Sequence, residues 1–290
     1  MSSGLEFYQH IPEKINPEII HFGFFSLGWY ALMYLVGFLV ILGLLRKRLG
    51  KGEGQVRMTK EQLFDFLILC FIFAVIGGRL GYVLFYNPLF YLAHPLAIIS
   101  PFDPETGAFM GIYGMSYHGG LIGVLCAVML FVKKYKIDFW NLSDFVIPAI
   151  PAGYFFGRLG NFLNGELYGR VTNSWLGMYF PSSVETQHFV SLQLRHPSQL
   201  YEALLEGLVL FAIFWLGRNR KKWQGNFLAL YLSSYSAARF FCEFFREPDA
   251  QIGFLFNGFT LGQLFSLVLF FCGLILFFTK KKNYATLKAC

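Results

Sequence analysis

The residues from Phe22 to Leu45 carry no charged side chain, and most of them are apolar. A helix of this length can cross the hydrocarbon core of a bilayer, which is roughly 30 Å thick. Similar apolar runs follow at about residues 63–86, 115–132, 139 or 144 to 158, 196–217, 223–245 and 259–279. Because a chain in lipid must satisfy its own backbone hydrogen bonds, this pattern predicts an all-α integral membrane protein with seven transmembrane helices.

The composition supports this interpretation and excludes others. Hydrophobic residues make up 56% of the 290 residues and charged residues only 14%, whereas soluble domains carry about 25% charged residues. The net charge of +7 raises the question of nucleic acid, but the basic residues gather at the ends of the apolar runs, so no nucleic-acid partner is expected. The five cysteines lie far apart without a CxxC spacing and are interpreted as small hydrophobic residues. The N-terminus has acidic residues and no basic segment, so no cleaved signal peptide is expected.

Four clusters of basic residues give the expected orientation. They follow the first, third, fifth and seventh runs, at residues 46–57, 133–136, 218–222 and 280–282. An odd number of crossings separates each cluster from the N-terminus, so all four share one side, which the positive-inside rule makes cytoplasmic. The N-terminus then lies outside and the C-terminus in the cytoplasm. We expect a single domain over residues 1–290, with an outer polar insert at about residues 170–195, between the fourth and fifth helices.

The basic residues outside these clusters and their flanks, apart from Lys14, are all arginines toward the outer side: Arg79, Arg158, Arg170, Arg195, Arg239 and Arg246. A buried charge in a membrane is unfavourable by several kcal/mol unless it is paired or hydrated. One interpretation is therefore that each arginine lies at the interface or pairs with a carboxylate, the candidates being Glu166, Glu202, Glu206 and Glu243. This interpretation is favoured for Arg170, Arg195 and Arg246.

For Arg158 and Arg239 together we favour a shared anionic ligand. Both lie beside very apolar sequence. A guanidinium group binds phosphate at two points and keeps its charge, and phospholipid phosphate is the abundant anion at an outer membrane surface. The pair therefore suggests a site for a lipid headgroup.

His118 is a candidate proton acceptor at the outer mouth of the third helix. Gly119, Gly120 and Gly123 follow it and allow a neighbouring backbone or a ligand to come close. A histidine near a helix start is more often an interfacial or capping residue, but its level with the arginines favours a role in proton transfer.

Other motifs give weaker signals. The sequence contains no HExxH, P-loop or GxSxG motif and no histidine–cysteine set with metal spacing, so no metal or cofactor is expected. Tyr30 is most simply part of an aromatic belt at the membrane surface. Glu202 and Glu206 have helical i, i+4 spacing and could orient an arginine or a histidine, although a structural role suits them equally.

Taken in order, several stretches of the chain resemble the motifs of the prolipoprotein diacylglyceryl transferase family. They are residues 29–34 (WYALMY), 77–82 (GGRLGY), 116–120 (SYHGG), 157–166 (GRLGNFLNGE), 195–202 (RHPSQLYE) and 243–249 (EFFREPD). The likeness extends over essentially the whole chain, and the long glycine–asparagine motif is highly specific. Residues 171–194 show no clear match, so nothing about substrate selection is carried onto them.

The resemblance implies a bacterial inner-membrane enzyme that starts lipoprotein maturation at the periplasmic face. Such an enzyme moves the diacylglyceryl group of phosphatidylglycerol to the lipobox cysteine thiol of a preprolipoprotein, which forms a thioether and releases glycerol phosphate. Matched by position, the functional residues of the family fall on Tyr30, His118, Arg158, Asn161, Gly169 and Arg239. Of these, the resemblance suggests catalytic roles for His118, Arg239 and Tyr30, and headgroup binding for Arg158, Asn161, Gly169 and Arg239.

The residues fit that chemistry without a metal. Alkylation of a thiol needs a thiolate, and a free cysteine has a pKa of about 8.5, so a base such as His118 would be useful. The departing phosphate ester needs fixed cations in a water-poor site, and Arg158 and Arg239 suit that role. Two alternatives are a lipid or small-anion transporter, which predicts symmetric halves and charges reaching the cytoplasmic side, and a non-catalytic scaffold, which leaves His118 and the arginines unexplained.

Overall fold

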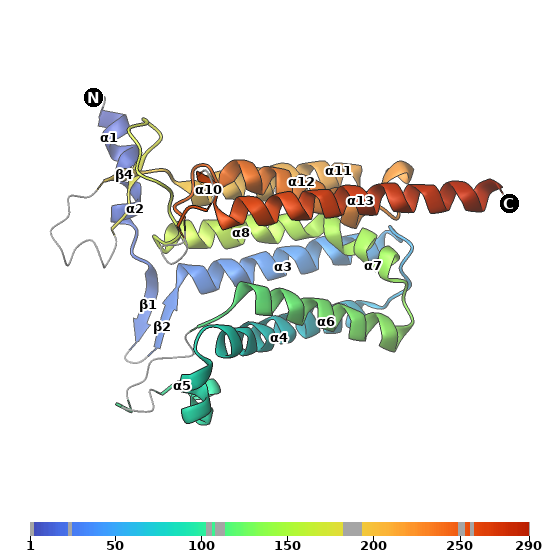
Figure 1. Ribbon diagram of the computed structural model, residues 1–290, viewed down its shortest axis with the longest axis horizontal. Helices are drawn as coiled ribbons and strands as arrows, with labels where there is room; N and C mark the ends of the chain where they lie inside the picture. Colours follow the sequence, from blue (N-terminus) through green and yellow to red (C-terminus); the bar gives the residue numbers. More distant parts are fainter. Residues whose placement is uncertain are drawn as a thin grey trace. The chain divides into compact units, whose positions relative to one another are not determined.

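The computed structural model describes residues 3–22, 25–102, 106–107, 114–181, 193–248, 253–255 and 258–289. The chain divides into two compact units, with residues 1–54 and 143–290 in unit 1 and residues 55–142 in unit 2. Within the described ranges, 5 helices are long and apolar enough to cross a membrane. They are α3 (Trp29–Gly50), α4 (Lys60–Phe85), α6 (Tyr117–Tyr135), the helix over Ser198–Gly217 and the first part, Leu261–Lys280, of α13 (Leu261–Ala289) (Figure 1).

The outward faces of these helices suit a lipid environment. On α13, Val268, Phe271, Ile275 and Phe278 each expose more than half of their surface. Apolar patches of this extent are rare on soluble monomers. The prediction of an all-α integral membrane protein is therefore confirmed at this level.

In unit 2, α4 and α6 run antiparallel and side by side (Figure 1). Glycines line the contact, because a Cβ atom on Gly119 would lie only 2.9 Å from Cα of Gly81. A Cβ atom on Gly77 would likewise lie 3.0 Å from Cα of Gly123. The glycines after His118 thus serve the approach of a neighbouring backbone, one of the two uses that the sequence allowed.

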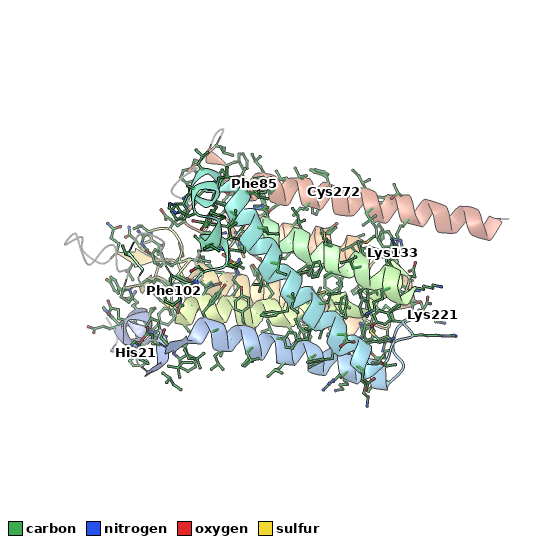
Figure 2. All side chains as sticks on the ribbon, turned by 90° about the horizontal axis from the view of Figure 1, so that it is seen from below. His21, Phe85, Phe102, Lys133, Lys221 and Cys272 are labelled. Carbon is green, nitrogen blue, oxygen red and sulfur yellow. The ribbon has the colours of Figure 1, made fainter. Side chains whose placement is uncertain are left out.

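The α4–α6 connection is held by Arg79. After α4 the chain forms α5 (Pro88–Ala93) and the 3₁₀ helix η1 (Pro95–Ile98). Arg79 donates from Nε to the carbonyl oxygen of Ile98, 2.8 Å away, and from Nη2 to that of Ala97, 2.6 Å away. In Figure 2, Phe85 marks this end of unit 2, and Lys133, near the end of α6, marks the other end. Arg79 therefore has a structural role.

In unit 1 the fourth apolar run is broken into three pieces: α7 (Phe139–Val146), whose first residues belong to unit 2, the 3₁₀ turn η2 (Ile147–Ala149) and α8 (Ile150–Leu163). Pro148 and Pro151 lack the amide hydrogens that a continuous helix would use, so the break follows from the sequence. α8 packs against α3, where a Cβ atom on Gly37 would lie 3.2 Å from the carbonyl oxygen of Gly153.

The fifth run forms α10 (Ser198–Glu202), the π-helix η3 (Ala203–Val209) and α11 (Leu210–Gly217). The short 3₁₀ helix η4 (Lys221–Trp223) leads to α12 (Phe227–Cys242), which packs along α13 (Figure 1). A core of Ile147, Leu210, Phe214 and Phe227 joins η2, α11 and α12.

Basic clusters of α3, α11 and α13 lie at one end of unit 1. Oε2 of Glu53 lies 3.4 Å from Nε of Arg48 and 2.9 Å from Nε of Arg218. Lys280 donates from Nζ to the carbonyl oxygen of Gly225, 2.5 Å away. Residues of the clusters that follow the first, fifth and seventh predicted spans therefore lie at the same end of unit 1.

The other end of unit 1 carries small polar elements. Here β1 (Glu18–Phe22) and β2 (Phe25–Gly28) form an antiparallel hairpin, and β3 (Met178–Tyr179) pairs with β4 (Leu194–Arg195) with Met178 opposite Arg195. The short helices α1 (Ser3–Gln9) and α2 (Ile11–Lys14) precede the hairpin. In Figure 2, His21 marks this end of the unit and Lys221 the basic end.

The sequence placed several helix ends wrongly. The first long helix begins at Trp29, not Phe22, because β1 and β2 occupy the residues before it, of which residues 23–24 lie outside the described ranges. α12 covers Phe227–Cys242 within the predicted span of 223–245, and α13 continues to Ala289, beyond residue 279. Of the insert at 170–195, residues 182–192 lie outside the described ranges.

Candidate active site

Arg158 and Arg239, from two different helices, share one carboxylate. Oε2 of Glu202 lies 2.7 Å from Nε of Arg158 on α8 and 3.0 Å from Nη1 of Arg239 on α12. Glu202 ends α10 and only 1% of its side chain is exposed. The two arginines that the sequence singled out as a pair are therefore neighbours around a buried anion.

Arg239 is engaged by further carboxylates. Nη2 lies 2.8 Å from Oε2 of Glu243, one turn later, and Nη1 lies 3.8 Å from Oε1 of Glu206. Thr260, just before α13, donates from Oγ1 to Oε1 of Glu243, 3.1 Å away. Gly262 leaves the room that Glu243 needs, because a Cβ atom there would lie 2.7 Å from Cδ of the carboxylate. Both terminal nitrogens of Arg239 thus face carboxylate oxygens.

Arg158 is held differently, because its polar contacts with the described residues are made through Nε. Nε donates to the hydroxyl oxygen of Tyr154, 2.8 Å away, and contacts Glu202 on the same side. Among the residues that the structure describes, no hydrogen-bond partner lies against Nη1 or Nη2 of Arg158. The side chain is 16% exposed, so this terminal N–H edge is open to a ligand.

The cluster contains more acids than bases. Two guanidinium groups, Arg158 and Arg239, face three carboxyl groups, Glu202, Glu206 and Glu243. The pairing interpretation of the arginines is therefore correct for both residues, although a shared external ligand was favoured for them. The open edge of Arg158 still leaves a place for that ligand.

Asn161 lies three residues after Arg158 on α8 and is 6% exposed. Its side-chain amide donates to Oε1 of Glu166, 2.9 Å away. The backbone carbonyl oxygen of Glu166 in turn accepts from Nε2 of the buried Gln199, 2.7 Å away. The glycine–asparagine motif therefore folds back on itself and is fastened to α10.

Tyr30 lies in the first turn of α3, next to the same motif. A Cβ atom on Gly160, two residues after Arg158, would lie 3.4 Å from Cα of Tyr30. Its hydroxyl donates to that of Tyr34, 3.0 Å away, and 37% of the residue is exposed. Tyr30 thus lies against α8, close in sequence to Arg158 of the cluster.

Gly169 has a steric role. Its amide donates to the carbonyl oxygen of His196, 2.8 Å away, and it forms an isolated β-bridge with Arg246. A Cβ atom would collide with the carbonyl oxygen of Phe245 and lie 2.8 Å from Cβ of His196. Only glycine fits where these three chain segments cross.

His118 is the one predicted functional residue in unit 2 and lies at the start of α6. The N-cap is Ser116, whose hydroxyl accepts from the amide of Gly119 at 3.3 Å. His118 packs its ring edge-on to Tyr117. Its membership of the arginine site stays a prediction.

The remaining arginines serve the structure around the site. Arg170 donates from Nε to the carbonyl oxygen of Arg246, 2.8 Å away, and Arg195 lies 3.3 Å from Glu247. In the described part of the chain, no group of histidine, cysteine and acidic residues could hold a metal ion. The sequence analysis missed Tyr154, although its position four residues before Arg158 puts both on one face of a helix.

Known proteins resemble the chain along almost its whole length. The family model described as prolipoprotein diacylglyceryl transferase matches residues 17–279. A phosphatidylglycerol–prolipoprotein diacylglyceryl transferase of Chlorobaculum tepidum is 45% identical over 278 residues, which is 95% of this chain and 93% of the relative. Proteins of the same name from Campylobacter jejuni (43% identical, 94% and 96% covered) and Rickettsia bellii (45% identical, 91% and 94% covered) are similar. This chain therefore belongs to the prolipoprotein diacylglyceryl transferase family.

Proposed function

We propose that the protein transfers the diacylglyceryl group of phosphatidylglycerol to the lipobox cysteine thiol of a preprolipoprotein, the first step of lipoprotein maturation. Its family membership and the names of its relatives support this activity. The substrates would be a membrane lipid and a signal-peptide segment, both delivered through the bilayer.

The observation that carries the proposal is the open edge of Arg158. Nε is fixed by Tyr154 and Glu202 while Nη1 and Nη2 have no partner among the described residues. Two parallel N–H groups are the donors that a phosphate group binds best. In a largely buried site they would hold the headgroup phosphate and stabilise the charge that grows on it as it departs.

In the reaction, the sulfur of the thiolate attacks the glycerol carbon that bears the phosphate ester. An S–C bond forms and the C–O bond to phosphate breaks, so the phosphate keeps the electron pair and leaves as glycerol phosphate. The proton of the thiol passes to a base, for which His118 is our candidate. Arg239, held by Glu202 and Glu243, would add a second fixed positive charge near the leaving group.

The other predicted residues would shape the headgroup site. Asn161 fixes the turn that carries Glu166, Gly169 permits the crossing of the insert over Phe245, and Tyr30 supplies a hydroxyl beside the cluster. We infer that all of these act within a single transferase domain over residues 1–290.

We also infer seven crossings of the bacterial inner membrane, with the N-terminus and the polar insert periplasmic and the C-terminus cytoplasmic. Support comes from unit 1, where α8 and α12 both start at the basic end and carry Arg158 and Arg239 near their far ends. The basic end would face the cytoplasm, which would place the arginine cluster toward the periplasmic leaflet.

The test is a mixture of the purified protein, phosphatidylglycerol vesicles and a lipobox peptide, scored by peptide mass. A thioether-linked diacylglyceryl peptide and free glycerol phosphate are expected. A peptide with serine in place of the lipobox cysteine is the control and should stay unmodified. Movement of phosphatidylglycerol between leaflets without any change in peptide mass would contradict the proposal and favour a transporter.

A further inference from the structure

The hydroxyl group of Tyr154 lies between an arginine and a carboxylate. Its oxygen accepts the hydrogen bond from Nε of Arg158 at 2.8 Å, and the hydroxyl donates to Oε2 of Glu206 at 2.5 Å. The ring of Tyr154 also lies under the guanidinium group, with 5.1 Å between Cζ of Arg158 and the ring centroid. Tyr154 thus contacts Arg158 at two places, its edge and its face.

Glu206 continues this chain of contacts to the second arginine. Its other oxygen, Oε1, lies 3.8 Å from Nη1 of Arg239, and the side chain is fully buried. Glu206 lies within the π-helix η3, and its neighbour Gly207 packs directly on α8, where a Cβ atom would lie 2.8 Å from Cα of Phe155. Tyr154 and Glu206 therefore link Arg158 to Arg239 along a path separate from Glu202.

The second path has a geometric consequence for Arg158. One contact, that of Nε with Glu202, fixes a point of the guanidinium group but leaves its plane free to turn. The hydrogen bond from the single Nε–H group to Tyr154 and the aromatic face beneath the guanidinium group fix the plane as well. The hydroxyl and ring of Tyr154 therefore fix the direction of the open Nη1 and Nη2 edge. Glu206 in turn holds the Tyr154 hydroxyl in place.

We propose that Tyr154 and Glu206 are positioning residues that aim the open edge of Arg158 at the phosphate of the lipid substrate. This proposal rests on the proposed function and adds to it the groups that orient the phosphate-binding arginine. Neither residue touches the reacting atoms, so both act through Arg158.

The first experiment replaces Tyr154 with phenylalanine, which keeps the ring and removes the hydroxyl. We expect kcat/KM for phosphatidylglycerol to fall by about 10- to 100-fold, because a small misplacement of a binding group has effects of that order. Tyr168→Phe is the control, since the ring of Tyr168 packs on Phe180 and on the guanidinium group of Arg195. An activity of Tyr154→Phe equal to that of the control would overturn the proposal.

A double-mutant cycle separates positioning from packing. In an Arg158→Lys background the Nε–H group is gone, so Tyr154→Phe should change kcat/KM by less than about twofold. If Tyr154 served only the packing of α8, the two losses would add, and that result would refute the positioning role. Wild-type protein that forms no thioether product would instead contradict the proposed function itself.

Glu206 supplies a test that does not depend on Tyr154 variants. Glu206→Gln keeps an oxygen that can accept from the Tyr154 hydroxyl, whereas Glu206→Leu does not. We expect the glutamine variant to retain at least about tenfold more kcat/KM than the leucine variant, with both compared at equal amounts of folded protein by size-exclusion chromatography. Equal losses in the two variants would contradict the link from Glu206 to Tyr154.

Discussion

Oε2 of Glu202 lies 2.7 Å from Nε of Arg158, although the two residues are 44 positions apart in the sequence. The packing of α10 on α8 brings them together. The contact is almost dry, because 1% of the Glu202 side chain is exposed. A buried carboxylate between two guanidinium groups holds the two groups at a fixed spacing and offsets part of their positive charge.

Replacing Glu202 with glutamine should therefore reduce stability and activity together. The change removes the carboxylate that contacts both Arg158 and Arg239, and the loss of one partner of a buried pair costs about 3–5 kcal/mol. The melting temperature in detergent and the rate of peptide lipidation measure the two effects. Glu247→Gln is the control, because Glu247 is 50% exposed and surface pairs contribute about 0–1 kcal/mol. An unchanged melting temperature in Glu202→Gln would count against the buried pair.

Replacing Arg158 with lysine tests two-point binding of the phosphate. Lysine keeps the charge but has no planar fork, so we expect kcat/KM for phosphatidylglycerol to fall by about 100-fold. Steady-state kinetics in mixed micelles measure it. Arg46→Lys, on the exposed surface of α3, is the matched control and should behave as the wild type. Full activity of Arg158→Lys would show that charge alone suffices.

His118→Gln tests the candidate base. Loss of a general base lowers the rate by about 10²- to 10⁴-fold, and the KM for phosphatidylglycerol should stay unchanged because binding is assigned to Arg158. Initial rates at varied phosphatidylglycerol concentration and saturating lipobox peptide measure both constants for the variant and the wild type. An active His118→Gln enzyme would remove His118 from this role.

Gly169→Ala should disrupt the crossing of three chain segments. The added methyl group meets the carbonyl oxygen of Phe245 and the side chain of His196, and overpacking of this kind costs about 1–3 kcal/mol. We expect a lower melting temperature and little lipidation activity. The control is Gly43→Ala, where the added group meets nothing within 4 Å. Normal stability of Gly169→Ala would mean that the segments move apart freely.

The surroundings of the Glu53 carboxyl predict how the stability of the folded protein depends on pH. Burial raises the pKa of its carboxyl, but the hydrogen bond and charge of Arg218 and the charge of Arg48 outweigh burial, so the pKa lies below its usual 4.5. A lowered pKa stabilises the folded state above the unfolded pKa, and this contribution is lost as the pH falls through the folded value.

We therefore expect Glu53→Gln to lower the melting temperature by a constant amount above about pH 5 and by less as the pH falls below that value. Thermal melts from pH 3 to pH 7 in detergent provide the measurement, with a pH range chosen around the usual pKa of 4.5. A difference that grows on acidification would refute the assigned sign.

The sequence predicted the class of fold better than the positions of the helix ends. Charge-free runs such as residues 29–45 identify membrane helices because hydrocarbon excludes charge. Helix ends were less certain, because proline breaks and short strands at the membrane surface follow local hydrogen bonding. Pro148 and Pro151 mark the break near the start of α8, yet only the structure shows that the break is a 3₁₀ turn over Ile147–Ala149.

The partners of the arginines could be named but not assigned. Glu243 lies four residues after Arg239, a spacing that predicts contact on one helix, and the contact is present. The link from Arg158 to Glu202 joins distant segments and follows only from the packing of α8 on α10. For the same reason, no pattern in the sequence predicts that Nη1 and Nη2 of Arg158 have no hydrogen-bond partner among the described residues.

The π-helix at Ala203–Val209 makes this part of the chain sensitive to its length. A π turn holds one residue more than an α turn, so a one-residue deletion here is absorbed when the segment closes into a regular α-helix, whereas a one-residue insertion would rotate Leu210 by about 100° relative to Glu202. Such an insertion would turn Phe214 away from its core while both acids stayed in the sequence. A scan of one-codon changes should therefore find this segment less tolerant of insertions than of deletions, which is a genetic sign of helical register and not of side-chain chemistry.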